Sequence, residues 1–329
     1  MKIALISALA AANLALSPAA AGAERAKPVW VTLGTGGGPV VQARRSQPAN
    51  ALIVGDDIYV FDIGEGFQRQ LKAAGLSPSN VRAIFLSHHH IDHVGGLMPF
   101  IVSRWAIGIH KNIPVIGPPG TNAMVDGILA GSVPIEQAPL AAGNGPGRTI
   151  ASTVTRSELP AGPSAPVEIY ADENIRVTTI GVDHFHDTDG KLSSTVFSYA
   201  FRAQIGTHSV VYSGDTGPSA NLATLAKGSD LLVSEVMDRG ATKQALEHMP
   251  LPAAYREGLM RHMDIEHMTP QHVARIARAA GVKQLVLTHL VPGRDDEQGG
   301  QGYIDDIQTN YRGPVVVARD GQRFAIPAD

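Results

Sequence analysis

The chain of 329 residues contains no cysteine. This absence excludes thiolate metal sites, iron–sulfur clusters, a cysteine nucleophile and a lipoprotein anchor, because each of them needs a sulfur atom at a defined position. Any bound metal ion must therefore be held by histidine, aspartate or glutamate side chains.

Charged residues are also scarce, at 17% of the chain, and 27 basic side chains against 30 acidic ones give a formal net charge of -3. A chain with this balance lacks a broad positive field that would attract a polyanion, so we expect no nucleic acid among its partners. Hydrophobic residues make up 44% of the sequence, which excludes a disordered chain and predicts a buried core.

The amino-terminal segment has the pattern of a secretory signal. Lys2 is followed by the apolar run 3–16 and then by Ala21-Gly22-Ala23, a small-x-small sequence that signal peptidase accepts. The apolar run is shorter than the roughly 20 residues that a membrane-spanning helix needs. We predict a signal peptide over residues 1–23, a single mature domain over 24–329, no stable membrane insertion after cleavage, and a periplasmic or secreted location.

Short β-rich runs alternate with helical patterns in the rest of the chain, which is typical of a layered α/β protein. The turn residues Gly55-Asp56-Asp57 predict a hairpin between two of the strands. The expected strands cover residues 29–33, 51–54, 58–62, 81–86, 175–180, 195–201, 209–213 and 231–233.

Helices are expected at residues 67–74 and 269–280. In the second, Thr269 suits the cap position, Pro270 suits the first helical position and Gly281 ends the helix. Residues 131–166 are rich in Gly, Pro, Ser and Ala with little periodicity, so we predict a long surface loop there.

The most informative segment is the His-x-His-x-Asp-His sequence at His88–His93, which offers five potential metal ligands within six positions. His88 and His90 share one side of an extended chain, because side chains two apart point the same way. Asp92 and His93 can turn toward a second position, so one short loop can serve two ions about 3.5 Å apart. A solvated polar loop is the alternative, and the wholly apolar strand before it argues against that.

Three further candidate ligands, His184, Asp215 and His289, each follow an expected strand. The ends of neighbouring strands open onto one edge of a sheet, where α/β proteins place their sites. We therefore expect these side chains to meet the histidine loop, with His186 as the main competitor of His184.

With these motifs the chain resembles the metallo-β-lactamase-fold hydrolase superfamily, and most closely its ribonuclease Z-like branch. The resemblance includes Leu33–Pro39, Asp62–Gly66, the histidine loop, Gly117–Thr121, Ser213–Thr216 and Leu287–His289. It implies a four-layer αββα sandwich in which two mixed β-sheets are flanked by helices.

The resemblance also implies a dinuclear zinc site, with Mn²⁺ or Fe²⁺ as alternative metals. One ion would be bound by His88, His90 and His184, and the other by Asp92, His93 and His289. Asp215 would bridge the two ions, and Asp62 would accept a ring N–H from a ligand histidine. Asp92 is counted among the catalytic residues as well as the ligands.

Glu235 and His267 resemble the Glu and His couple of this branch, in which the carboxylate orients an imidazolium that acts as general acid. An unrelated surface pair is the alternative. The interval between His184 and Asp215, where the family carries its RNA-gripping arm, is filled by two expected strands, so we expect no transfer-RNA processing.

The leading hypothesis is an exported dinuclear zinc hydrolase of small phosphodiesters or sulfate esters, in which a hydroxide generated by the metals attacks and His267 donates a proton. A lactonase or β-lactamase and a non-catalytic metal-binding protein are the alternatives. A homodimer is one option for the assembly. The Met-rich stretch 248–268 is expected to be either adaptable core or a lid over the metals.

Overall fold

The computed structural model describes residues 27–138, 148–187, 190–293 and 300–327. The predicted signal peptide over residues 1–23 lies outside the described residues. In the described part of the chain, no helix combines the length and the hydropathy needed to cross a bilayer.

The first sheet is mixed and has seven strands. They are β1 (Val29–Gly34), β2 (Ala49–Val54), β3 (Asp57–Ile63), β4 (Val81–Phe85), β5 (Ile113–Gly117), β6 (Val154–Glu158) and β14 (Gln322–Ala325). Their order is β14-β1-β2-β3-β4-β5-β6. The strands from β14 to β3 pair antiparallel, and those from β3 to β6 pair in parallel.

The second sheet is also mixed and has seven strands. They are β7 (Val167–Ala171), β8 (Arg176–Val182), β9 (Ser198–Ile205), β10 (His208–Tyr212), β11 (Leu231–Met237), β12 (Gln284–Val291) and β13 (Val315–Val317). Their order is β13-β12-β11-β10-β9-β8-β7. The strands from β7 to β10 pair antiparallel, and those from β10 to β13 pair in parallel.

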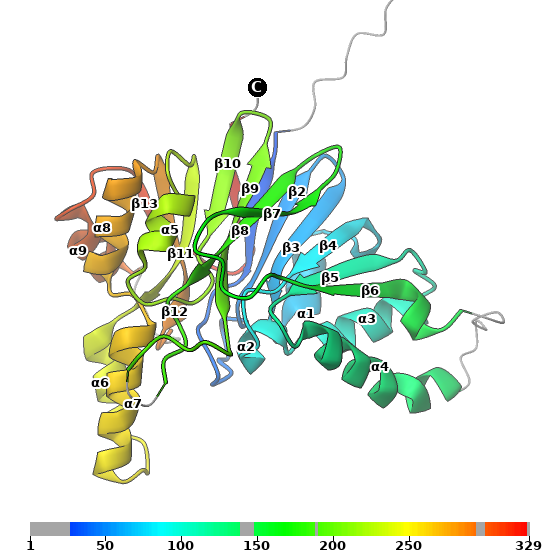
Figure 1. Cartoon of the computed structure of the whole chain (residues 1–329), viewed down its shortest axis with the longest axis horizontal. Helices are drawn as coiled ribbons and strands as arrows, with labels where there is room; N and C mark the ends of the chain where they lie inside the picture. Colours follow the sequence, from blue (N-terminus) through cyan, green and yellow to red (C-terminus); the bar gives the residue numbers. More distant parts are fainter. Residues whose placement is uncertain (1–26, 139–147, 188–189, 294–299, 328–329) are drawn as a thin grey trace, which may run out of the picture.

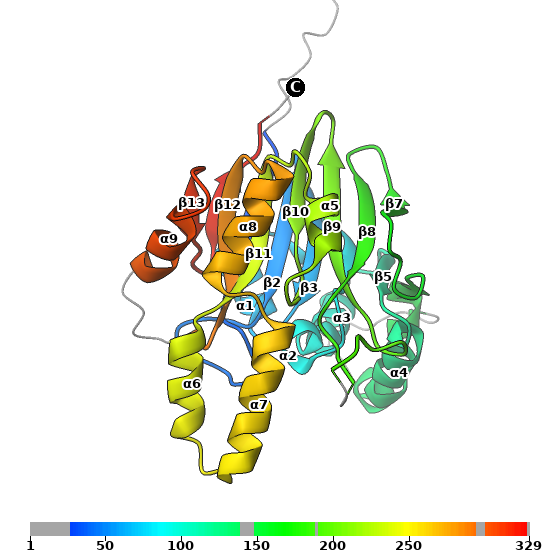
Figure 2. The same ribbon diagram turned by 60° about the vertical axis from the view of Figure 1, so that its left-hand side comes forward.

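Helices cover the outer face of each sheet (Figures 1 and 2). The first sheet carries α1 (Phe67–Ala73), α3 (Leu97–Ala106) and α4 (Thr121–Gln137), together with the short α2 (Ile91–Val94) and the 3-10 turns Pro78–Asn80 and Ile150–Thr153. The second sheet carries α5 (Ala220–Leu225), α8 (Pro270–Ala280) and α9 (Gln301–Gln308). A helical hairpin of α6 (Arg239–Glu247) and α7 (Ala253–Glu266) projects from the body.

Three buried apolar clusters hold these layers together. Aromatic side chains fill the space between the sheets, where the ring centroids of Phe61 and Trp30 are 5.1 Å apart and those of Phe61 and Phe85 are 5.0 Å apart. A second cluster joins the first sheet to α1, α3 and α4, and a third joins the second sheet to α5, α8 and α9. Because β3 and β4 are covered on both faces, the apolar stretches 58–61 and 83–85 within them are buried without alternation.

The predicted α/β sandwich is confirmed, and so is the hairpin, since β2 pairs antiparallel with β3 across the Gly55-Asp56-Asp57 turn. The predicted helix at 269–280 is confirmed as α8. Its end at Gly281 has a φ of 65°, a left-handed conformation that favours glycine. The Met-rich stretch 248–268 does not form one buried cluster. Met268 is buried in the core. The others, Met249, Met260 and Met263, are half-buried on the α6–α7 hairpin or the turn that joins its helices.

The predicted long surface loop over residues 131–166 is wrong in its described parts. Helix α4 continues to Gln137 despite Gly131 and Pro134, and β6 pairs in parallel with β5. The reason is tertiary packing: Val125 of α4 is buried in the cluster under the first sheet, and such burial overrides a weak local preference. Residues 139–147 of that stretch lie outside the described residues.

Candidate metal centre

The chemistry-bearing side chains of this chain gather at one edge of the two sheets. Each comes from the end of a strand or from the loop that follows it, because strands that run in the same direction have their carboxyl ends at one edge of the sheet. The contributing elements are β3 with Asp62, the loop and α2 after β4 with His88–His93, the loops after β8 and β10 with His184 and Asp215, β11 with Glu235, and β12 with His289.

A first ligand group consists of His88, His90, His184 and Asp215, whose candidate ligand atoms all lie within 4.8 Å of one another. Nε2 of His88 lies 3.0 Å from Nδ1 of His90, and Nε2 of His184 lies 3.2 Å from the same atom. Three ring nitrogens therefore converge on one point, beside the Oδ2 atom of Asp215, which is 3.8 Å from Nε2 of His88.

A second ligand group consists of Asp92, His93 and His289, again within 4.8 Å of one another. Oδ2 of Asp92 lies 3.5 Å from Nε2 of His93 and 3.4 Å from Nε2 of His289. Oδ2 of Asp215 lies 3.3 Å from Nε2 of His93 and 3.0 Å from Nε2 of His289. Asp215 thus stands between the two groups, where a bridging carboxylate would have to be.

Asp62 orients a ligand histidine of each group through hydrogen bonds, directly for His93 and through Ser87 for His88. Its Oδ2 atom accepts hydrogen bonds from Nδ1 of His93, from the hydroxyl of Tyr212 and from the hydroxyl of Ser87, each at 2.7 Å. Its Oδ1 atom accepts the backbone N–H of Ser87 at 2.7 Å. The ring nitrogen Nδ1 of His88 lies 3.0 Å from the Ser87 hydroxyl, so the same carboxylate also steadies the first group.

Two non-glycine residues in the described part of the chain have a positive φ, and both belong to this centre. They are Asp62, with a φ of 58°, and the ligand His289, with a φ of 42°. Such backbone conformations cost free energy and persist where the surrounding structure enforces them, often at functional sites.

The donor set fits divalent metal ions. Oδ1 of Asp215, Nε2 of His93 and Nε2 of His289 are buried, yet their geometry makes no hydrogen bond. Buried polar atoms without hydrogen-bond partners are costly, so their gathering at one place indicates a site for a cation. Imidazole nitrogen and carboxylate oxygen are ligands that suit Zn²⁺, and they also accept Mn²⁺ and Fe²⁺.

The protonation states support the same assignment. Burial lowers the pKa of His88 and His184 well below the usual value, which keeps these rings in the neutral form that binds metal. Burial alone would also lower the pKa of His289, but the Asp215 charge raises it to about 10. Because an imidazole must be neutral to bind a metal ion, metal binding at His289 would release the proton that this pKa favours.

Glu235 and His267 form a pair beside the ligand groups. Oε2 of Glu235 lies 2.9 Å from Nδ1 of His267, while its Oε1 atom accepts the backbone N–H of Thr216 at 3.0 Å. The second nitrogen of His267 is left for the site, since His267 groups with Asp215 and His289 within 4.8 Å. Burial alone would lower the pKa of His267, but the negative charge of Glu235 raises it above the usual value.

The other histidines near the loop have different partners. Nε2 of His89 lies 2.9 Å from the hydroxyl of Thr121, so this ring points away from both ligand groups. The backbone N–H of His186 donates to Oε1 of Glu266 at 3.1 Å, and its ring joins neither group. His184, and not its competitor His186, is therefore the residue that the structure places with His88 and His90.

Sequence reasoning missed several groups that support the ligands. Nδ1 of His184 donates to the backbone carbonyl of Glu266 at 2.9 Å, and the backbone N–H of Gly38 donates to Oδ2 of Asp92 at 2.9 Å. Backbone groups carry no residue-type signal, so only coordinates reveal them. The Tyr212 hydroxyl had a weak signal, because it lies three residues before Asp215 in a strand that leads into the site.

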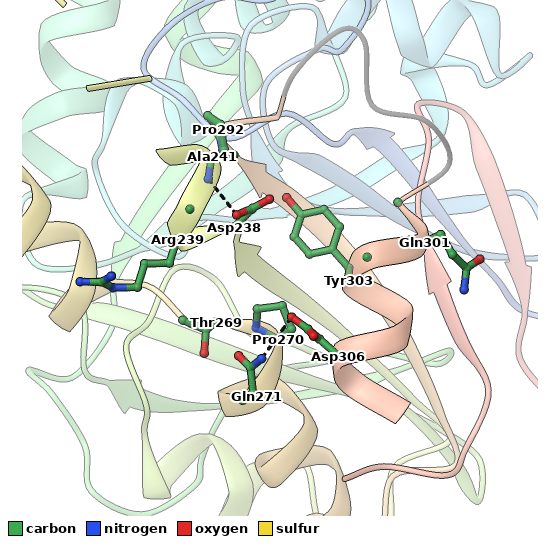
Figure 3. Close-up of a pocket in the computed structure, with 13 residues that line it drawn as sticks. Asp238, Arg239, Ala241, Thr269, Pro270, Gln271, Pro292, Gln301, Tyr303 and Asp306 are labelled. Carbon is green, nitrogen blue, oxygen red and sulfur yellow. Dashed lines mark hydrogen bonds between the residues drawn. The ribbon is translucent and has the colours of Figure 1, made fainter. Parts of the chain in front are cut away.

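A surface pocket lies apart from these ligand groups. Its volume is about 710 Å³. Figure 3 shows its lining residues, which come from the start of α6, the start of α8 and the start of α9. The Asp238 carboxylate accepts the backbone N–H of Ala241 at 2.9 Å, and Gln271 donates to Asp306 at 3.1 Å. No metal ligand lines this cavity, so it is distinct from the site described above.

Comparison with known proteins gives a consistent result. A family model described as a β-lactamase superfamily domain matches residues 59–290. A ribonuclease Z of Mycobacterium sp. (strain KMS) is 32% identical over 80% of this chain and 85% of its own length. Human tRNase Z, short form, superposes with a TM-score of 0.63 at 22% identity, over 91% of this chain and 100% of that protein. Zn²⁺-bound PqqB from Methylobacterium extorquens has a TM-score of 0.63 at 15% identity, over 90% of this chain and 99% of that chain.

These relatives correct one expectation from the sequence. The prediction of no nucleic acid among the partners is wrong, because curated relatives that match 80% or more of this chain carry the name ribonuclease Z. The physical reason is that a net charge of -3 averages over the whole chain. It omits the charge that two bound dications would add locally, and such ions are often the largest charges in a site.

The shared position of Asp215 leads to a test. Asp215→Ala removes a carboxylate that stands between both ligand groups, so metal content and activity should fall together. His186→Ala is the matched control, because the His186 ring belongs to neither group, and it should keep its metal. Elemental analysis of the purified proteins measures both variants. An Asp215→Ala protein with the metal content of the wild type would contradict the shared role.

Proposed function

Since this chain belongs to the metallo-β-lactamase-fold superfamily and to its ribonuclease Z-like branch, we propose that it is a dinuclear metal hydrolase of phosphodiester bonds. The proposal rests on one observation above all, the Glu235–His267 pair beside the two ligand groups. A protein that only binds metal has no need of a buried, carboxylate-oriented histidine at this position. RNA belongs to the substrate class under test, because the relatives are named for acting on it.

The ligand assignment follows the geometry. His88, His90 and His184 would hold one ion, Asp92, His93 and His289 the other, and Asp215 both. When bound, two Zn²⁺ ions would supply Lewis acidity to a phosphoryl oxygen and lower the pKa of a water molecule toward about 7. Asp62 fixes the His93 ring by accepting its Nδ1–H at 2.7 Å, which leaves Nε2 as the ligand atom.

His267 supplies the proton that a leaving alkoxide needs. Glu235 accepts the Nδ1–H of His267, raises its pKa and so favours the imidazolium form. The proton on the other ring nitrogen then faces the ligand groups. Glu235 is itself fixed, because its Oε1 atom also accepts the backbone N–H of Met268 at 3.3 Å.

We also place the protein in the periplasm or outside the cell, on the signal-like composition of residues 1–23. Phosphodiesters that reach this compartment would then be the substrates. Mass analysis of the protein recovered from its native cell fraction tests this location, and a chain that still begins at Met1 would contradict it.

A substrate panel tests the phosphodiesterase assignment. We expect zinc-loaded protein to hydrolyse bis-p-nitrophenyl phosphate and at least one natural phosphodiester, either cyclic AMP or an RNA with a 3′ extension. Nitrocefin, an acyl-homoserine lactone and p-nitrophenyl sulfate serve as comparison substrates. Turnover of one of these three and of no phosphodiester would contradict the proposal, and so would no turnover at all.

The proposed acid has a characteristic signature. General acid catalysis contributes roughly 10²- to 10⁴-fold, and it matters most when the leaving group is a poor one. His267→Ala should therefore slow hydrolysis of an alkyl phosphodiester by about that factor, while p-nitrophenolate, a good leaving group, departs at nearly the wild-type rate.

Metal content should not change in this variant. His248→Ala is the control, because that exposed side chain hydrogen-bonds to the backbone of Gln244 outside the site. Steady-state rates with the two substrates measure the difference, and equal slowing of both would show that His267 is not the proton donor.

A further inference from the structure

A carboxylate from the far end of the chain reaches the neighbourhood of the metal centre. Asp320 lies in the turn between β13 and β14, and its Oδ1 atom accepts the backbone N–H of Thr35 at 3.0 Å and the Thr35 hydroxyl at 2.7 Å. Its Oδ2 atom accepts the backbone N–H of Ser46 at 2.6 Å and Nε2 of Gln70 at 3.1 Å. One carboxylate thus collects four hydrogen bonds from three residues.

These hydrogen bonds hold the two ends of a loop together, and we call these paired ends the neck of the loop. Thr35 and Ser46 are the two ends of the loop 35–46, which makes up most of the connection 35–48 between β1 and β2. The backbone N–H of Gly36 donates to the carbonyl of Ser46 at 3.0 Å. Because Asp320 binds the backbone N–H groups at both ends, it fixes where the loop leaves the sheet and where it returns.

The loop lies directly on the second ligand group. The backbone N–H of Gly37 donates to the carbonyl of Leu290 at 2.9 Å, and that of Gly38 donates to Oδ2 of Asp92 at 2.9 Å. This Oδ2 is the same atom that faces His93 and His289. A carboxylate oxygen has two lone pairs, so it can accept the Gly38 N–H with one and bind a cation with the other.

The approach is so close that only glycine fits. A Cβ atom on Gly38 would lie 2.3 Å from Cβ and Cγ of Asp92. A Cβ atom on Gly37 would lie 3.0 Å from Cε1 of His289 and 2.7 Å from a methyl group of Val291. The glycine backbone of the loop thus lies close to two ligands of the second group, and it bonds directly to one of them, Asp92.

We propose that Asp320 is a positioning residue for the second metal ion. By closing the neck of the loop 35–46, it places the Gly38 N–H where it holds the Asp92 carboxylate toward His93 and His289. Within the described residues, the first group has no hydrogen bond to this loop, and its rings have other partners: the Ser87 hydroxyl for His88 and the carbonyl of Glu266 for His184. This inference rests on the dinuclear centre proposed above, and it predicts an effect on one of the two ions.

Calorimetric titration of metal-free protein with Zn²⁺ tests this role. Asp320→Asn preserves the size of the side chain but replaces one accepting oxygen by an NH₂ group. That group cannot accept the N–H or O–H that faces it, so at least one hydrogen bond to the loop is lost. Loss of a group that orients a ligand typically weakens metal binding about 10- to 100-fold. We expect that loss for the second Zn²⁺ and unchanged affinity for the first.

A matched control separates this role from general destabilisation. Asp172 also collects several hydrogen bonds, from the hydroxyls of Tyr59 at 2.7 Å and Tyr170 at 2.8 Å and from the backbone N–H groups of Asn174 at 2.9 Å and Ile175 at 3.0 Å. It lies beyond the end of β7, and no residue of either ligand group bonds to it. Asp172→Asn should lower the melting temperature and leave both Zn²⁺ affinities as in the wild type.

Gly38→Ala keeps the test decisive if Asp320→Asn does not fold. It should weaken the second Zn²⁺ selectively, whereas Gly131→Ala in α4, where no atom lies within 4 Å of the added Cβ, should weaken neither. Wild-type affinities in both test variants, or equal weakening of both ions, would overturn the inference.

The same titration separates failure of this inference from failure of the proposed function. Wild-type protein that binds two Zn²⁺ ions and hydrolyses no phosphodiester would overturn the function, while selective weakening in the variants would still support the role of Asp320. Wild-type protein that binds fewer than two ions would overturn both.

Discussion

The hydrogen bonds of the Asp62 carboxylate tie the two sheets together at the point where the metals would bind. Asp62 belongs to the first sheet, and it accepts the hydroxyl of Tyr212 from the second sheet and Nδ1 of His93 from the histidine loop. It does so with a left-handed backbone, at a φ of 58°. The strain is sustained by the packed sandwich around it, so the ligand positions depend on the docking of the sheets as much as on the loop that carries them.

A second constraint is that several histidine rings and several carboxylates are buried close together. The rings of His88 and His93 have centroids 4.0 Å apart, and that of His184 is 4.8 Å from His88, all out of contact with water. The buried carboxylates of Asp92 and Asp215 add charges that also need partners. Two cations would satisfy both sets at once, because each accepts nitrogen lone pairs and neutralises carboxylate charge. Bound cations would therefore also stabilise this edge of the sandwich.

Much of this site could be predicted from the sequence, for definite reasons. His88, His90, Asp92 and His93 lie in one short motif, and His184, Asp215 and His289 follow apolar strands whose ends must meet. The loop between α4 and β6 could not be delimited, because Gly131 and Pro134 are weak local signals that the packing of α4 overrides. The roles of Asp320 and of the Gly38 N–H could not be predicted from the sequence either. Their roles arise from contacts across 285 and 54 residues, and no pattern of residue types records them. The prediction of no nucleic-acid partner was wrong because the amino-acid composition does not include the positive charge that bound metal ions would add to the site.

Diffraction from crystals of Zn²⁺-soaked protein, collected on both sides of the zinc absorption edge, tests the central claim most directly. The account predicts two anomalous peaks about 3.5–4 Å apart, one among His88, His90 and His184 and the other among Asp92, His93 and His289, with Asp215 in contact with both. A single peak, or peaks away from these side chains, would contradict it.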